Sequence, residues 1–255
     1  MSAQNYYERI SEVLATINST QADALGRAGD AMAEAIANDH RVYLFGSGHS
    51  VIPVMDIFPR YGSFVGFYPL YDPRLMWTNV VGPGGARELL WLERQEGYAK
   101  VFLQSYSLEK GDCIIVWSHG GLNAAPIEVA LEAKKLGVTV ITVSSHANKA
   151  IAKPSHSSGK VLSDVADIAI DNCVPPEDAL VNVGQIENVA AGSTMAAVFV
   201  AMSLVAECAK QLKVRGKHLV TFVSPNVPGV EKDQNQQVFE AFTAGFFRRK
   251  LGTEG

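Results

Sequence analysis

The stretch VYLFGSGHSVIPVMD, residues 42–56, decides the fold. It opens with an apolar run from Val42 to Phe45, which predicts a short buried strand. Glycines and hydroxyl side chains follow at once, and Pro53 stands where the first turn of a helix is expected. A strand that passes directly into a helix is the unit from which parallel α/β sheets are built.

A second step of the same kind lies in CIIVWSHGGLNAAPIEVA, residues 113–130. Asn123 precedes Pro126 by three positions, as Ser50 precedes Pro53. Serine and asparagine are good N-caps, and a proline in the first helical turn loses no hydrogen bond. We therefore expect each turn to lie on a helix N-terminus, where free N–H groups and the positive end of the dipole favour an anion.

Further patterns along the chain predict a doubly wound α/β fold. Apolar stripes indicate helices over 6–17 and 21–38, and an amphipathic helix covers 127–137 with Gly137 at its end. Nearly continuous apolar runs, each followed by a helix, indicate a parallel sheet that is covered on both faces. The strand candidates are 41–45, 63–68, 113–117, 138–143 and 167–171, with a sixth candidate at 219–223.

The predicted architecture is a three-layer αβα fold with a five-stranded parallel sheet in the flavodoxin-like order 2-1-3-4-5. No low-complexity linker divides the chain, so we expect one domain over 1–255, with 1–39 as an N-terminal helical arm. In this order the first and third strands are neighbours, and their turns face each other at the topological switch point. Val51 excludes a Gly-x-Gly-x-x-Gly dinucleotide motif, and no Gly-Lys-Ser or Gly-Lys-Thr is present.

Four motifs together resemble the sugar isomerase (SIS) domain family, nearest to its phosphoheptose-isomerase-like and single-domain members. They are FGSGHS (45–50), IIVWSHGG (114–121), GVTVITVSS (137–145) and LSDVADIAID (162–171). The resemblance implies a five-stranded parallel sheet, binding of phosphorylated sugars, and sites completed by a second subunit. Members of the family include aldose–ketose isomerases, ether-cleaving lyases and sugar-sensing domains of transcription regulators.

The resemblance also implies binding residues in both turns. The second loop of the family usually reads Ser-x-Ser-Gly-x-Thr, and here Gly120 and Asn123 stand in place of its second serine and its threonine. Two hydroxyl donors are thus replaced, which leaves open whether the bound anion is a phosphate. The expected binding residues are Ser47, Gly48, Ser50, Ser118, Gly120, Gly121, Asn123, Ser144 and Ser193.

Aldose–ketose isomerisation needs a base and an acid, for which a carboxylate and a neutral histidine are suitable. Relatives carry a glutamate in the helix after the first strand, and the matching residue is Asp56. We expect Asp56 to be the base and His49 to be the proton shuttle. The alternative for Asp56 is an ion pair with Arg60, four positions along the helix.

Other carboxylates compete with Asp56. Glu93 and Glu96 lie three apart on one helix face, which is typical of a solvated helix end, and Glu187 precedes a long uncharged segment. His119 and His146 also follow predicted strand ends, but no tight ligand spacing supports a metal site. We expect no metal and no cofactor.

Composition restricts the kinds of partner and the compartment that can be expected. The 255 residues carry a net charge of −4 and no basic run, which argues against nucleic acid. Three separated cysteines and an N-terminus without an apolar signal segment suit the cytoplasm. The uncharged run 188–206 is rich in small residues and indicates a buried or subunit-interface helix over 188–211 rather than a membrane span.

These observations predict a phosphosugar isomerase that acts on a small-molecule sugar phosphate and assembles as a homodimer or homotetramer. One alternative is a lyase of amino-sugar ethers. Another is a non-catalytic sensor, although the forty residues before the first strand offer no basic recognition helix.

Overall fold

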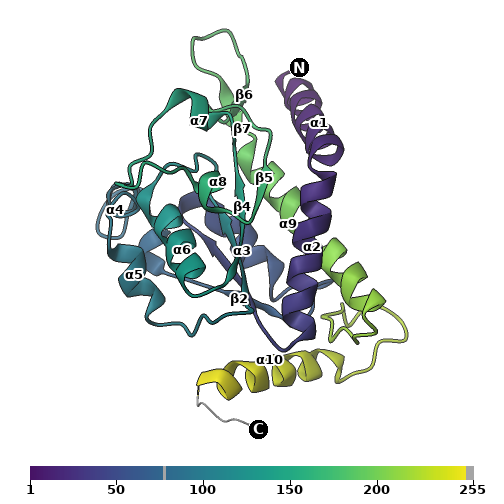
Figure 1. The fold of residues 1–255 in the computed structure, drawn as a ribbon. Helices are drawn as coiled ribbons and strands as arrows, with labels where there is room; N and C mark the ends of the chain where they lie inside the picture. Colours follow the sequence, from purple (N-terminus) through teal and green to yellow (C-terminus); the bar gives the residue numbers. More distant parts are fainter. Residues whose placement is uncertain (77–78, 251–255) are drawn as a thin grey trace.

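The computed structural model describes residues 1–76 and 79–250. Its main sheet has five parallel strands in the order β2-β1-β3-β4-β5, which confirms the predicted flavodoxin-like order (Figure 1). The predicted strands recur within a few residues of their expected ends. They are β1 (Val42–Gly46), β2 (Phe67–Pro69), β3 (Cys113–Trp117), β4 (Thr139–Ser144) and β5 (Ile168–Asp171).

Helices cover both faces of this sheet (Figure 1). One face is packed by α1 (Ser2–Thr20), α2 (Ala22–Ala37), α3 (Val51–Ile57) and α9 (Ser193–Val214). The other is packed by α4 (Ala86–Leu92), α5 (Tyr98–Leu103), α6 (Ala124–Lys135) and α8 (Leu162–Val165). The short elements η1 (Gly48–Ser50), η2 (Pro73–Leu75) and α7 (Asn148–Ile151) lie in the connections.

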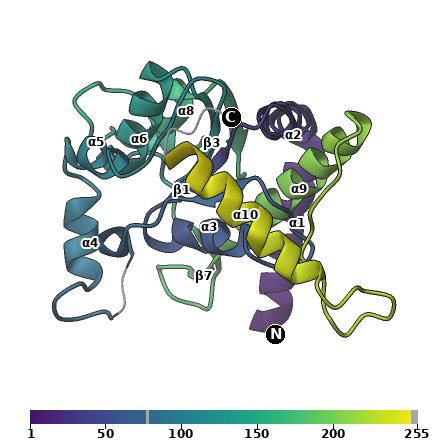
Figure 2. The ribbon, with the colours of Figure 1, turned by 90° about the horizontal axis from the view of Figure 1, so that it is seen from below.

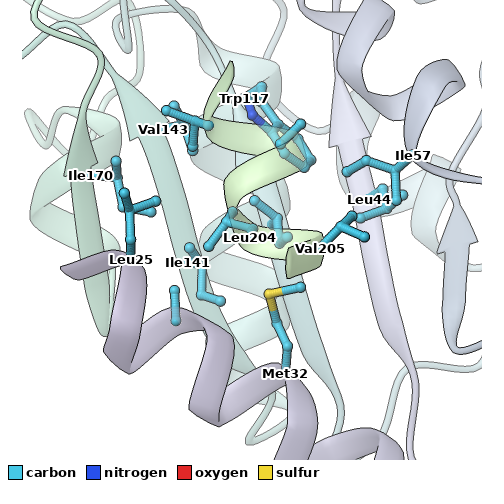
Figure 3. Close-up of a cluster of buried hydrophobic side chains, with 14 of the residues drawn as sticks. Leu25, Met32, Leu44, Ile57, Trp117, Ile141, Val143, Ile170, Leu204 and Val205 are labelled. Atoms are coloured by element: carbon cyan, nitrogen blue, oxygen red, sulfur yellow. The ribbon is translucent and has the colours of Figure 1, made fainter. Parts of the chain in front are cut away.

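Alternation along each strand divides the core between these two layers. In β3, Ile115 and Trp117 face α2 and α9, whereas Ile114 and Val116 belong to the cluster on the opposite face. Figure 3 shows Trp117 in one cluster with Val143, Leu204 and residues of α2. The near-continuous apolar runs thus reflect strands that are buried on both faces.

The region before α9 differs from the prediction. The uncharged segment does not begin a helix at Asn188, because Val189–Ala191 forms β7, which pairs with β6 (Ala179–Val181) in an antiparallel hairpin. The expected helix start at 188 is therefore wrong, and α9 begins at Ser193. The sixth strand candidate at 219–223 does not join the main sheet, and its Thr221 makes only an antiparallel bridge to Phe64.

The C-terminal helix α10 (Gln234–Lys250) crosses the molecule at the end opposite the β6–β7 hairpin (Figures 1 and 2). Phe242 stacks on Tyr68 and Phe58, with ring centroids 5.0 and 5.1 Å apart. The guanidinium of Arg249 lies 2.7 Å from the fully buried carboxylate of Asp112, just before β3. α10 thereby covers the amino edge of the sheet and neutralises a buried charge.

Within the described residues, α9 is the one helix that is long and apolar enough to cross a membrane by length and composition. Of its most apolar window, 44% is buried inside the molecule, and it packs along α2 and α3. Core helices often have these properties, so α9 is weak evidence for a membrane span.

The packing of α2 on α9 depends on Gly29. A Cβ at this position would lie 2.5 Å from the Cβ of Glu207, whereas a Cβ at Gly26 of the same helix would meet nothing within 4 Å. We predict that Gly29→Ala lowers the free energy of unfolding by about 1–3 kcal/mol, because the two backbones must separate. Gly26→Ala is the matched control and should raise it by about 0.5–1 kcal/mol. Urea unfolding measures both, and equal effects would contradict the close approach.

Candidate active site

A cavity of about 220 Å³ lies where the turns after β1 and β3 meet. The strand order predicted that these turns would face each other, and the structure places them on the same cavity. Its remaining walls come from the end of α4, the end of β4, the segment after β5, and the start of α9. The lining residues are Ser47, Gly48, His49, Ser50, Leu89, Leu90, Glu93, Trp117, Ser118, His119, Gly120, Asn123, Val143, Asn172, Asp178, Ser193, Thr194 and Ala197.

The first turn is tight because β1 ends in a glycine. A Cβ at Gly46 would lie 2.1 Å from the carbonyl oxygen of Ser50, so no larger residue fits there. Gly48 has φ 59°, in the left-handed region that glycine adopts readily. The Ser50 N–H donates to the Ser47 carbonyl at 3.1 Å, and the turn runs directly into α3. The Ser50 hydroxyl does not cap α3, and Ser50 lines the cavity instead.

The second turn offers fewer free N–H groups than its sequence suggested. The Gly121 N–H donates to the Ser118 hydroxyl at 3.2 Å, and the Ala125 N–H, in the first turn of α6, donates to the Glu93 carbonyl at 2.9 Å. Pro126 has no N–H to offer. The Asn123 side chain does not cap α6, and Asn123 also lines the cavity.

Glu93 is a buried carboxylate in the wall of the cavity. It follows α4 directly and is only 7% exposed. Its carboxyl group accepts a hydrogen bond of 2.9 Å from the Ser47 hydroxyl. Burial raises the pKa of Glu93 above its usual range, against the opposing effects of the Ser47 hydrogen bond and of Arg94. A buried carboxyl group with a raised pKa in a cavity is characteristic of an acid–base group.

Asp56, which the sequence favoured as the base, does not line this cavity. Its carboxylate lies 2.5 Å from the Arg60 guanidinium. The side chain of Asp56 is 35% exposed and that of Arg60 is 44% exposed. Asp56 borders a separate hollow with Tyr61 and Phe239. The expectation that Asp56 faces the same cleft as the anion is therefore wrong, because α3 turns this residue away from the two loops.

Most of the other predicted residues are brought together. Ser47, Gly48, His49, Ser50, Ser118, Gly120, Asn123 and Ser193 all line the cavity. Gly121 and Ser144 do not, because they pack on each other behind the loop: a Cβ at Gly121 would lie 3.2 Å from that of Ser144. Of the competing carboxylates, Glu96 accepts hydrogen bonds from Ser157 and Glu187 is exposed in the hairpin loop.

Three polar residues of the cavity had little or no signal in the sequence. Asn172 directly follows β5, a position at the carboxyl edge that the strand pattern could have indicated. Asp178 has φ 64° and accepts hydrogen bonds from the N–H groups of Gly192 and Ser193 and from the Ser193 hydroxyl. Trp117 lies within a strand and gave no sign of a polar role.

Side chains that could bind a metal ion lie close together outside this cavity. Within 1–76 and 79–250, the one close group is His40, Glu109 and Asp112, at the amino edge of the sheet. The Arg249 guanidinium lies 2.6 Å from Glu109 and 2.7 Å from Asp112 and so occupies this group. His49, His119 and His146, which follow strand ends, do not form such a group among the described residues.

Comparison with known proteins identifies the family. The model of the SIS domain matches residues 5–145, more than half of the chain. The chain belongs to the SIS domain family. It is also 35% identical over 227 residues to a UPF0309 protein of Shouchella clausii, covering 89% of this chain and 91% of that protein. A UPF0309 protein of Oceanobacillus iheyensis is 34% identical over 240 residues, covering 94% and 96%.

Solved structures agree on the fold of this SIS domain protein. A phosphoheptose isomerase from Neisseria gonorrhoeae superimposes with a TM-score of 0.54 at 13% identity, covering 82% of this chain and 97% of that chain. A phosphoheptose isomerase from Francisella tularensis gives 0.53 at 14% identity, covering 82% and 96%. The SIS fold is a phosphosugar-binding fold. The reaction and the residues that perform it have to be inferred from the arrangement of the cavity.

Proposed function

We propose that this SIS domain protein is an aldose–ketose isomerase of a small phosphorylated sugar, with Glu93 as its base. The observation that carries this proposal is the buried Glu93 carboxyl group, hydrogen-bonded to Ser47 in the cavity where the two turns meet. The likeness in fold to two phosphoheptose isomerases is consistent with it. Ligand cavities range from about 300 Å³ upward, so a cavity of about 220 Å³ favours a small ligand.

The proposed chemistry moves one proton between adjacent carbons. The Glu93 carboxylate removes the proton from the carbon beside the carbonyl, and the bonding pair forms the C=C bond of an enediolate while the carbonyl oxygen takes the charge. A proton passes between the two oxygens, and Glu93 returns its own proton to the neighbouring carbon. The raised pKa makes Glu93 a stronger base when ionised and a ready acid once protonated.

The phosphate is proposed to lie against the hydroxyl groups and backbone of the two turns. No lysine or arginine lines the cavity within the described residues, so the hydroxyl groups of Ser50 and Ser118 and nearby N–H groups would carry the recognition. The single hydroxyl proton of Ser47 is already donated to Glu93. Two carboxylates, Glu93 and Asp178, stand in the same walls. The phosphate therefore belongs on the side of the turns, away from Asp178, with the carbon chain towards Glu93.

We also propose assembly into a homodimer or homotetramer in the cytoplasm. The loop between β6 and β7 and the start of α9 carry large exposed apolar side chains, including Ile186, 96% exposed, and Met195, 48% exposed. Small residues along α9 would let a second helix approach closely. Light scattering should give at least a dimer at micromolar concentration, and a monomer would contradict the proposal.

Turnover tests the reaction and its base. With a panel of aldose and ketose phosphates followed by NMR in deuterated water, wild-type protein should interconvert one pair and place deuterium at the carbon beside the carbonyl. Glu93→Gln keeps the shape and the hydrogen-bond acceptor for Ser47 but removes the basicity, so turnover should fall by at least about 100-fold. Ligand-induced thermal stabilisation should remain.

Asp56→Asn is the matched control, since it removes a carboxylate outside the cavity, and it should retain turnover. Loss of activity in Asp56→Asn with full activity in Glu93→Gln would return the role of base to Asp56. Ether cleavage with deuterium incorporation would indicate a lyase, and binding without any exchange would indicate a sensor.

A further inference from the structure

His119 makes one side-chain hydrogen bond within the described residues. Its Nδ1 lies 3.2 Å from Nδ2 of Asn172, a residue only 2% exposed. Its other ring nitrogen, Nε2, is buried and has no hydrogen-bond partner among those residues. Because a buried polar atom without a partner is costly, the arrangement of this ring requires an explanation.

The orientation of the Asn172 amide is fixed from the other side. The Val174 N–H donates to Oδ1 of Asn172 at 3.1 Å, so the oxygen must face Val174 and the NH₂ group must face His119. A flipped amide would set two donors against each other at Val174. The hydrogen bond from the Val174 backbone thus decides which end of the Asn172 amide is oxygen and which is nitrogen.

An amide NH₂ group can only donate, so His119 Nδ1 must accept and cannot carry a proton. The neutral ring then carries its proton on Nε2. The doubly protonated imidazolium would place an N–H of its own against the Asn172 NH₂ group. Asn172 therefore selects one tautomer of His119, which is neutral and donates from Nε2.

We propose that Asn172 is a positioning residue that holds His119 as a neutral N–H donor for the substrate oxygen on which charge develops. This assignment rests on the proposed isomerase function. His119 and Glu93 line the same cavity, so donor and base would act on one substrate. Trp117 Nε1, buried in the same wall, is a second N–H group without an acceptor among the described residues, as expected where a ligand supplies the acceptor.

In this proposal, Glu93 and His119 each perform one part of the reaction. Glu93 takes the carbon-bound proton, and the electrons move onto the carbonyl oxygen, where the His119 N–H stabilises the negative charge by a hydrogen bond. A neutral imidazole suits this role, because it donates without first having to be protonated. His49, on the exposed rim, then remains the candidate for moving the proton between the two oxygens.

The tautomer can be measured without any assay of activity. In protein labelled with ¹⁵N at histidine, two-dimensional NMR should show His119 with a proton-free, pyridine-type Nδ1 and a protonated, pyrrole-type Nε2. Asn172→Asp is isosteric but offers an acceptor to the ring, so it should move the proton to Nδ1. A protonated Nδ1 in the wild-type protein would overturn the proposal, as would a folded Asn172→Asp variant that keeps the wild-type pattern.

Matched truncations separate positioning from packing. Asn172→Ala should leave a mixture of tautomers. Asn148→Ala removes a buried amide that donates a hydrogen bond to the His119 carbonyl and not to its ring, so it should leave the wild-type pattern. With an active substrate, Asn172→Asp should lower kcat about 100-fold with little change in KM. The predicted tautomer without any turnover would reject the proposed function alone, and turnover with the other tautomer would reject the positioning role alone.

Discussion

The pairing of β1 with β3 as parallel neighbours is the constraint on which the site depends. Their register sets Gly46 beside Trp117, so the last residues of the two strands lie side by side and both turns begin at the same level of the same edge. Neither strand could be shifted by one residue without exchanging its two buried faces. The core that fixes the register on both faces therefore also fixes the distance between the turns.

Glu93 connects this edge to the helices around it. Its backbone carbonyl accepts the Ala125 N–H at the start of α6, and its carboxyl group accepts the Ser47 hydroxyl of the first turn. A carboxyl group held in this way among apolar neighbours such as Leu89 lowers stability whenever it is ionised. Proteins retain such groups where chemistry needs them. His119, whose buried Nε2 has no partner in the part of the chain that the structure describes, has the same character.

The sequence predicted the fold well because the fold depends on patterns that are local. Apolar runs indicated all five strands of the sheet, and the order 2-1-3-4-5 was expected by analogy with doubly wound folds. The hairpin before α9 was missed because Val189–Ala191 continues the same uncharged composition as the helix, and only the pairing with β6 separates them. α10 had no prediction, and its place depends on long-range contacts such as that of Arg249 with Asp112.

The site was predicted only in part, for a similar reason. The two turns could be identified because glycine and hydroxyl residues follow a strand directly. The choice of Asp56 relied on counting positions along α3, whereas Glu93 reaches the cavity through the packing of α4, which no local pattern records. Glu93 and Glu96 look alike in the sequence, but one is buried against Ser47 and the other is bonded to a surface loop.

The pH dependence of stability tests most directly whether Glu93 is the buried acid–base group of the cavity. Because burial raises its pKa, the folded chain keeps a proton that the unfolded chain has already released, and stability falls as the pH rises through that interval. Glutamine carries no such proton. The Tm of Glu93→Gln minus that of the wild-type protein should therefore increase from about pH 4 upward and then level off. Each kcal/mol of difference in the free energy of unfolding should appear as about 2–4 °C in Tm. Asp56→Asn, at the ion pair outside the cavity, is the control and should show no such increase. A difference for Glu93→Gln that is independent of pH, or that falls as the pH rises, would contradict the assignment.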